Sequence, residues 1–327
     1  MSISVRDRPL SVAVVGVGEM GRNHARCLAS MKGVDLVAVV DSDEDRRNAA
    51  AAAYECQSIS SLSQLPNIDA AVVAVPTALH AEVGSALMER GVHCLVEKPL
   101  AIDPEQVQAL IQAADASNVI LQVGHIERFN PAVRQLEVLL QGQKVLVANA
   151  RRMSAVSARV GDIDVVMDLM VHDLDVILYL MGTQVDNTNA VGVDGSHGFD
   201  HVTALLSFAG GPMASLTASR ITQNQIRKLE VTTKEDFFSV DYSNQELLIF
   251  RQGRLDNDDM AEGRYVLDVD TRRVFVRRTE PLVSELEHFV GAIRGDHENE
   301  VDGRQALNAL NLVWEIQEKL GRSTTES

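Results

Sequence analysis

The sequence has little basic charge and no long apolar runs. Its 30 Lys and Arg residues stand against 46 Asp and Glu residues, which gives a net charge of −16. Proteins that bind nucleic acid normally carry a basic face, so this balance argues against a nucleic-acid partner. No apolar run is long enough to cross a bilayer, and the first residues do not resemble a secretion signal. We therefore expect a cytoplasmic protein with no membrane partner.

Cysteine is also scarce. The three cysteines, Cys27, Cys56 and Cys94, are an odd number at unrelated spacings. This argues against a disulfide framework and against a cysteine metal site, and it is typical of a reducing compartment. Buried, unreactive thiols are the favoured interpretation. No other ligand set has useful metal spacing, so we predict no metal.

The first third of the chain alternates between short apolar runs and helical periodicity. This alternation predicts a parallel sheet that is covered by helices on both faces, that is, a doubly wound α/β domain of the Rossmann type. Asp103-Pro104 is typical of a helix start, with an N-cap followed by proline. The expected strands are 10–15, 34–40, 69–75, 93–96 and 120–123, and the expected helices are about 20–31, 43–54, 79–90 and 103–116.

The pattern changes after Asn130-Pro131 to strands that follow one another. This predicts an α+β domain with a large, mostly antiparallel, open-faced sheet. A helix at 164–181 would cover one face, and the other face would meet a second subunit. We expect domains at 1–124 and 125–327, with the terminal helix 303–320 able to pack back on the first. The other expected elements are helices 131–140 and 281–294 and strands 144–151, 201–208, 213–220, 226–233, 236–241, 246–251, 264–269 and 273–277, with Gly210-Gly211 as a hairpin turn.

A glycine motif follows the first strand. Gly16 permits a tight turn, Gly18 leaves room for a phosphate, and Gly21 lets the next helix pack closely on the strand. Asp41 ends the second strand, where an acid accepts hydrogen bonds from ribose hydroxyls and repels a 2′-phosphate. Asp41 could instead cap the following helix, although Ser42 and Asp43 are also available for that. The motif predicts a dinucleotide site for NAD rather than NADP, with Glu19 and Met20 beside the glycines.

Polar residues end the third and fourth strands, where the carboxyl ends of a doubly wound sheet face the ligand. We expect cofactor contacts from Pro76, Thr77 and His80 after the third strand and from Glu97 and Lys98 after the fourth. A lysine in this position is costly to bury without a task or a partner. A solvent-exposed loop lysine is the alternative.

The helix at 164–181 carries Asp168, His172 and Asp175, whose spacing places them on one helix face. A carboxylate one turn before a histidine is a usable acid/base pair. The alternative is that these residues form the wet face of an amphipathic helix. His24, in the first helix, could touch the cofactor, but we expect it to pack or hydrogen-bond within its own helix.

Together these motifs resemble the Gfo/Idh/MocA oxidoreductases. The resemblance rests on the glycine loop with Asp41, Val75-Pro76 with His80, Glu97-Lys98-Pro99 and the Asp168–Asp175 helix. It implies that Lys98 is the catalytic lysine, His172 the general base and Asp168 its supporting acid, in a homodimer or homotetramer. One departure is Asp164, where the family helix often has glycine.

The segments Gly124–Val133 and Met167–Asp175 resemble the branch of the family that oxidises UDP-N-acetylglucosamine at C3. That resemblance implies a keto product for an aminotransferase in amino-sugar synthesis of the lipid A type. A sugar nucleotide needs cations for its pyrophosphate. The candidate substrate contacts, besides Asp168 and His172, are Arg128, Asn130, Arg151 and Arg159, with Arg152 close by. A free polyol such as inositol is the alternative substrate, and a non-catalytic NAD-binding regulator is a third possibility.

Overall fold

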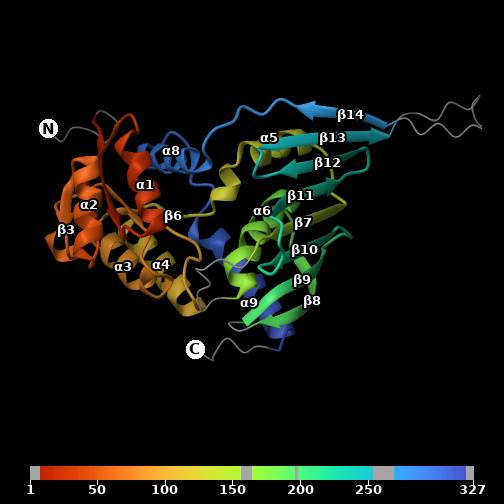
Figure 1. Cartoon of the computed structure of the whole chain (residues 1–327), viewed down its shortest axis with the longest axis horizontal. Helices are drawn as coiled ribbons and strands as arrows, with labels where there is room; N and C mark the ends of the chain where they lie inside the picture. The colour runs from red at the N-terminus through yellow and green to blue at the C-terminus, as the bar shows by residue number, and fades with distance from the viewer. Residues whose placement is uncertain (1–7, 156–163, 196–197, 253–268, 322–327) are drawn as a thin grey trace, which may run out of the picture. The chain divides into compact units, whose positions relative to one another are not determined.

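A computed structural model of the chain describes residues 8–155, 164–195, 198–252 and 269–321 (Figure 1). The chain forms two compact units. The first comprises Met1–Ile126 and Glu280–Asn308, and the second comprises Glu127–Thr279 and Ala309–Ser327. The sequence-based boundary at 124/125 lies two residues from the first crossing, but the return of the chain at residue 280 was not expected. In the described residues, no helix combines the length and the apolar character needed to cross a membrane.

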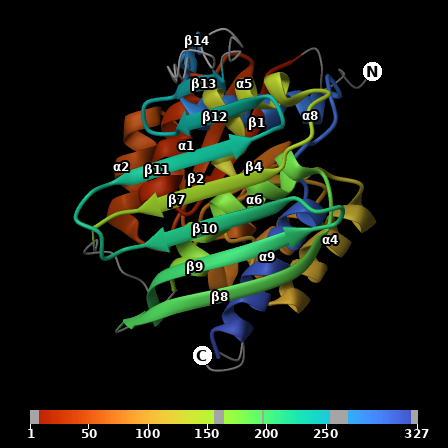
Figure 2. The same ribbon diagram turned by 90° about the vertical axis from the view of Figure 1, so that its right-hand side faces the viewer.

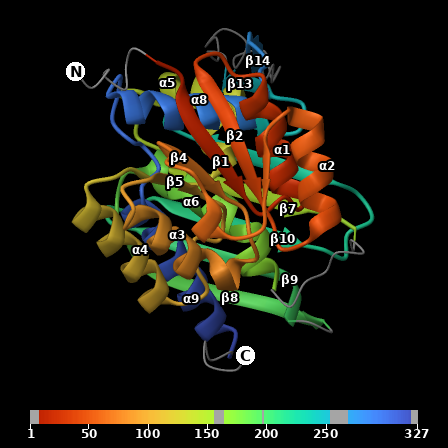
Figure 3. The ribbon, with the colours of Figure 1, turned by 90° about the vertical axis from the view of Figure 1, so that its left-hand side faces the viewer.

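The first unit contains a six-stranded parallel sheet with the order β3-β2-β1-β4-β5-β6 (Figure 3). Its central strands are buried on both faces, as the continuous apolar runs predict, and this confirms the Rossmann-type fold. The strands are β1 (Leu10–Val15), β2 (Val34–Val40), β3 (Gln57–Ile59), β4 (Ala70–Val73), β5 (His93–Val96) and β6 (Leu121–Val123). The helices are α1 (Glu19–Ala29), α2 (Glu44–Tyr54), α3 (His80–Met88), α4 (Pro104–Ser117) and α8 (Pro281–Arg294).

Helix α8 belongs to the core of the first unit. Its buried side chains Leu282, Leu286 and Phe289 recur at helical spacing and join the cluster that contains Leu10 and Val39. The sequence predicted this helix, but within the second domain. Its apolar stripe shows that it is covered on one side, and periodicity alone does not show which sheet covers it.

Two helix starts have the caps that the sequence indicates. The Asp103 side chain accepts a hydrogen bond from the Gln106 N–H at 2.8 Å, and Pro104 follows as the first helical residue. Asp43 caps α2 by accepting from the Arg46 N–H at 2.9 Å. Asp43 therefore supplies the cap, which leaves Asp41 for another role.

The second unit contains an eight-stranded sheet with the order β14-β13-β12-β11-β7-β10-β9-β8 (Figure 2). Among the described strands of this second sheet, only the β7–β10 pair is parallel, which confirms the mostly antiparallel sheet. Gly210 and Gly211, both at positive φ, form the expected turn between β9 and β10. The strands are β7 (Val147–Met153), β8 (Val185–Gly195), β9 (Gly198–Phe208), β10 (Met213–Ser219), β11 (Ile226–Thr232), β12 (Asp236–Asp241), β13 (Glu246–Gln252) and β14 (Val269–Val274).

Helices of the same unit cover one face of this sheet. Helix α6 (Val171–Met181) packs on β7 and β10, and α5 (Pro131–Leu140) packs on β12 and β13. Figure 2 views the sheet from its other face, over which no described element of the unit passes. The last helix, α9 (Gly303–Lys319), begins in the first unit and ends in the second.

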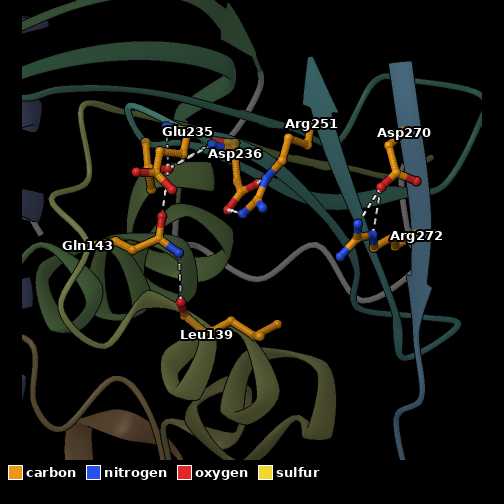
Figure 4. A network of polar contacts seen from close by, with 8 residues as sticks. Leu139, Gln143, Glu235, Asp236, Arg251, Asp270 and Arg272 are labelled. Atoms are coloured by element: carbon orange, nitrogen blue, oxygen red, sulfur yellow. Dashed lines mark hydrogen bonds and ion pairs between the residues drawn. The ribbon is translucent and has the colours of Figure 1, made fainter. Parts of the chain in front are cut away.

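A polar cluster lies where the chain leaves α5 (Figure 4). Arg251 of β13 donates two hydrogen bonds to Asp236 of β12, at 2.6 and 2.8 Å, and holds the pKa of that carboxyl below its usual range. Gln143 donates to the Leu139 carbonyl at 3.0 Å and accepts from Thr233 at 2.8 Å. Leu139, Gln143, Asp236 and Arg251 are among the residues that line a cavity of about 200 Å³. The bond between Gln143, which follows α5, and Thr233, which follows β11, joins the end of α5 to the sheet.

The predicted strands miss two that the structure contains. Strand β8 is the exposed edge of the sheet, and its polar sequence Val-Asp-Asn-Thr-Asn hides the alternation by which a half-buried strand is recognised. Strand β3 is only three residues long. The strand predicted at 273–277 is observed as β14 at Val269–Val274, and the one predicted at 264–269 lies almost wholly outside the described residues.

Candidate functional site

The glycine turn after β1 has the geometry that a dinucleotide pyrophosphate requires. Gly16 has φ +88°, where an L side chain is strained, and a Cβ there would lie 2.5 Å from the Ala74 carbonyl oxygen. A Cβ on Gly21 would lie 1.7 Å from the Gly16 oxygen, so helix α1 packs on the turn only with glycine there. A Cβ on Gly18 would meet nothing within 4 Å, which leaves open space at the start of α1. The turn therefore fits a phosphate held at the helix N-terminus.

Asp41 connects the end of β2 to this turn. One carboxylate oxygen accepts from the Val17 N–H at 2.8 Å and the other from the Asp43 N–H at 2.9 Å. Each oxygen keeps a second acceptor position, so the half-buried carboxylate can also accept from ribose hydroxyls. The residues of the turn and Asp41 together fit bound NAD.

Replacing Asp41 should weaken the binding of NADH more than the binding of NADPH. In Asp41→Asn the negative charge and one acceptor oxygen are lost, so we expect the Kd for NADH to rise about tenfold. The Kd for NADPH should change less, because repulsion of its 2′-phosphate is also removed. Fluorescence titration with both nucleotides measures the two constants. Equal discrimination in the variant and the parent would contradict the role of Asp41.

His80, predicted to contact the cofactor, hydrogen-bonds two backbone carbonyl groups near it. Its Nδ1 lies 3.0 Å from the Pro99 carbonyl oxygen and its Nε2 lies 2.9 Å from the Val75 oxygen. Burial lowers the pKa of His80, and those two carbonyls and Glu97 oppose the change. The imidazole thus joins the ends of β4 and β5. Of its neighbours, Thr77 is half-buried and Pro76 is exposed, as is Met20 beside the glycines.

Glu97 and Lys98 follow β5, as expected. The Glu97 side chain is buried and Lys98 is half-buried. His24 packs inside the unit, as one of the two expected roles has it, but its Nε2 bonds Glu97 at 2.6 Å and not a group of its own helix. Periodicity places His24 on the buried face of α1, but it cannot identify a partner 73 residues away. Lys98 precedes Pro99 through a cis peptide bond.

The helix that carries His172 is not a regular α-helix throughout. Val166–Met170 form a π-helical segment, and α6 starts at Val171. A π-helical turn closes i→i+5 hydrogen bonds, so the segment that carries Asp168 is wound more loosely than the α-helix that carries His172. Both side chains are half-buried. π-Helical turns are common at functional sites. Asp164, at the place of the family glycine, caps this segment through the Val166 and Met167 N–H groups.

Arg128 and Asn130, predicted to bind substrate, have structural partners. Arg128 donates to both oxygens of Asp175, at 2.7 and 3.0 Å, and the pair is buried. Asn130 caps α5 through the Ala132 N–H and donates to the Tyr242 carbonyl. These contacts give both residues a structural role, and their substrate assignments stay predictions.

Arg151 lies on the uncovered face of the sheet. Along β7 the buried residues alternate with half-buried ones, and Arg151 is among the half-buried residues, where it pairs with Glu230 at 3.1 Å. Helix α6 packs on the opposite face, so within one chain Arg151 and His172 lie on opposite sides of this sheet. Arg159 lies outside the described residues.

A buried ionic cluster beside α6 was not recognised in the sequence. Arg152 donates to both oxygens of Asp173, at 2.8 and 2.9 Å, and to Glu127 at 2.8 Å. Burial raises the pKa of Asp173, and the Arg152 guanidinium opposes that rise. The signal was present in β7, where Arg152 continues the core-facing series that Ala148 and Ala150 begin. The cluster fixes α6 to the sheet.

The candidate residues are thus distributed over both units. The glycine turn, Asp41, Glu97 and Lys98 belong to the first unit, and Asp168 and His172 belong to the second. Among the residues that the structure covers, there is no group of three metal-ligating side chains.

The chain is similar to known proteins over nearly its whole length. Residues 10–125 match the family model described as "Oxidoreductase family, NAD-binding Rossmann fold", and residues 161–323 match its C-terminal α/β domain. A UDP-N-acetylglucosamine 3-dehydrogenase of Acidithiobacillus ferrooxidans is 33% identical and covers 94% of this chain and 96% of its own. Its solved structure has a TM-score of 0.88, with 97% and 99% of the two chains covered. An inositol 2-dehydrogenase of Rhizobium meliloti is 26% identical, over 92% and 93%.

These matches, together with the fit of the glycine turn to a dinucleotide, settle the family and the cofactor. The chain belongs to the Gfo/Idh/MocA oxidoreductase family and is an NAD-dependent dehydrogenase.

Proposed function

We propose that the protein oxidises a secondary hydroxyl of a sugar to a ketone and that its substrate is UDP-N-acetylglucosamine, oxidised at C3. The observation that carries this proposal is the 33% identity to a UDP-N-acetylglucosamine 3-dehydrogenase over nearly the whole of both chains. The segments Gly124–Val133 and Met167–Asp175 support it.

In the proposed reaction, His172 removes the proton of the hydroxyl that becomes the ketone. Lys98 hydrogen-bonds the same oxygen and stabilises the negative charge that develops there. Asp168 supports His172. Bound NAD accepts the hydride from the carbon, so that a ketone and NADH result.

The substrate pyrophosphate requires cations, and the three described arginines of the predicted set have carboxylate partners within the chain. Arg128 and Arg152 are committed to buried carboxylates, and Arg151 faces away from α6. Arg159 is the remaining candidate from the predicted set. The alternative substrate is therefore a free polyol, which the inositol 2-dehydrogenase relatives favour.

A substrate panel distinguishes the two. The formation of NADH is followed by its near-ultraviolet absorbance. The compounds tested are UDP-N-acetylglucosamine, UDP-N-acetylgalactosamine, UDP-glucose, myo-inositol and free N-acetylglucosamine. We expect turnover with the first compound and a 3-keto product by NMR. Turnover of myo-inositol without response to any UDP-sugar would overturn the proposal in favour of the polyol.

We further propose that the protein forms a homodimer or homotetramer through the uncovered sheet face, and that it works in the cytoplasm before an aminotransferase. Exposed apolar side chains on the strands of this sheet, Val191, Leu205 and Met213, support the assembly. The free cysteines are compatible with a reducing compartment. Light scattering of the purified protein tests the assembly, and a monomer would contradict it.

A further inference from the structure

Three titratable side chains of the first unit are buried and interact at Glu97, the residue before Lys98, and they take no part in the proposed chemistry. They are His24 of α1, Glu97 after β5 and Glu285 of α8, exposed by 0%, 8% and 0%. Glu97 links the first of them to the lysine: one of its oxygens lies 2.6 Å from His24 Nε2, and the other accepts the Lys98 N–H at 3.1 Å. Glu97 therefore connects α1, which begins at the glycine turn, to Lys98.

Glu97 is held tightly on its remaining side. A Cβ on Gly124, after β6, would lie 3.0 Å from a Glu97 carboxylate oxygen, so glycine at this position lets the backbone pack closely against the carboxylate. Burial by itself would raise the pKa of Glu97, but the hydrogen bond from His24 and the positive charges nearby outweigh it and lower that pKa. Glu97 is therefore the ionised member of the group.

Glu285 is in the opposite situation. Neither of its carboxylate oxygens has a hydrogen-bond partner within the described part of the chain, and Gln122 Nε2 donates to its backbone carbonyl at 3.2 Å. A fully buried carboxylate without donors or a cation is too costly to ionise. Burial, and then the negative charge of Glu97, raise the pKa of Glu285 well above its usual range.

We propose that His24, Glu97 and Glu285 form one positioning unit for Lys98, in which Glu97 is ionised and bonded to His24 while Glu285 stays a neutral acid. The unit rests on the role of Lys98 in the proposed function. The titratable groups that face Glu97 are His24 from α1, Lys98 from its own segment, His80 from α3 and Glu285 from α8. A second negative charge at Glu285 would oppose the ionised state of Glu97 on which the placement of Lys98 depends.

Glu285→Gln tests the neutral acid without any activity assay. The unfolded chain releases the Glu285 proton above about pH 4.5, while the folded chain keeps it, so this group lowers stability as pH rises. The glutamine variant lacks this loss. We expect its Tm to equal that of the parent near pH 4.5 and to exceed it at pH 8, on the order of 5 °C. The infrared carbonyl band of a protonated carboxylic acid should be present in the parent at pH 8 and lost in the variant.

Glu287→Gln is the matched control, because Glu287 lies on the same helix and is exposed. It should change neither the band nor the pH dependence of the Tm. A Glu285→Gln variant that is less stable than the parent at pH 8, or a parent without the band, would overturn the neutral acid and with it the proposed unit.

His24 variants test the link to Lys98, with UDP-N-acetylglucosamine and NAD as probes. His24→Leu removes the donor to Glu97, so Glu97 should take up a proton more readily. We expect kcat to fall at least about tenfold near pH 7, to recover partly at higher pH, and to leave the KM for the sugar nucleotide and the Kd for NADH nearly unchanged. His24→Gln keeps an N–H donor and should restore most of kcat.

The outcomes separate this unit from the proposed function. A folded His24→Leu enzyme with the parental kcat and pH profile would overturn the positioning role. If the parent does not oxidise UDP-N-acetylglucosamine, the proposed substrate fails, whereas the infrared and Tm results on Glu285 still decide whether the neutral acid exists.

Discussion

Lys98→Met should reduce turnover by on the order of a hundredfold or more while the protein still binds NADH. Methionine keeps the length of the lysine stem but loses the ammonium group that would stabilise the developing charge on the substrate oxygen. Cofactor binding should persist because the glycine turn and Asp41 lie on other segments. The measurements are kcat with UDP-N-acetylglucosamine and the Kd for NADH by fluorescence titration.

Two further variants make this result specific. Lys32→Met removes an exposed lysine from the turn after α1 and should leave turnover unchanged. His172→Ala removes the proposed base and should give a loss similar to that of Lys98→Met, which would tie the two units to one reaction. If both Lys98→Met and His172→Ala turn over substrate at the parental rate, the catalytic assignment is wrong and the binding-regulator alternative regains support.

The sequence predicts the first unit well because its signals are local. A buried parallel strand is a continuous apolar run, and a dinucleotide turn has glycines where a Cβ would collide, as the 1.7 Å contact at Gly21 shows. The place of α8 is not local information, since its apolar stripe would suit either unit. The exposed edge strand β8 has no clear periodicity to read.

The same difference between local and non-local information applies to the residues of the candidate site. Residues identified by motif, such as Gly16, Asp41 and Lys98, lie on the segments that the sequence indicates. Roles that depend on partners could not be predicted. An arginine near a site looks the same in sequence whether it binds a pyrophosphate or, like Arg128, a buried aspartate. The π-helical turn at Asp168 likewise leaves no trace in residue spacing.

Arg152→Met should lower the free energy of unfolding of the second unit by about 3–5 kcal/mol. The variant leaves Asp173 and Glu127 buried without the guanidinium that bonds both of them. Because Asp173 would then be held at a pKa raised by burial, the loss should be largest at neutral pH and should shrink as pH falls and the carboxyl is protonated. Urea unfolding at several pH values, followed by far-UV circular dichroism, measures this loss.

The adjacent residue supplies the control for this prediction. Arg151 lies on the same strand and also pairs with a glutamate, but its side chain is 43% exposed, so Arg151→Met should cost no more than about 1 kcal/mol. The double variant Arg152→Met/Asp173→Asn should recover part of the loss, because the amide removes the unpaired buried charge. Equal losses for Arg151→Met and Arg152→Met would mean that the buried cluster does not stabilise the attachment of α6 to the sheet, and that the placement of His172 depends on other contacts.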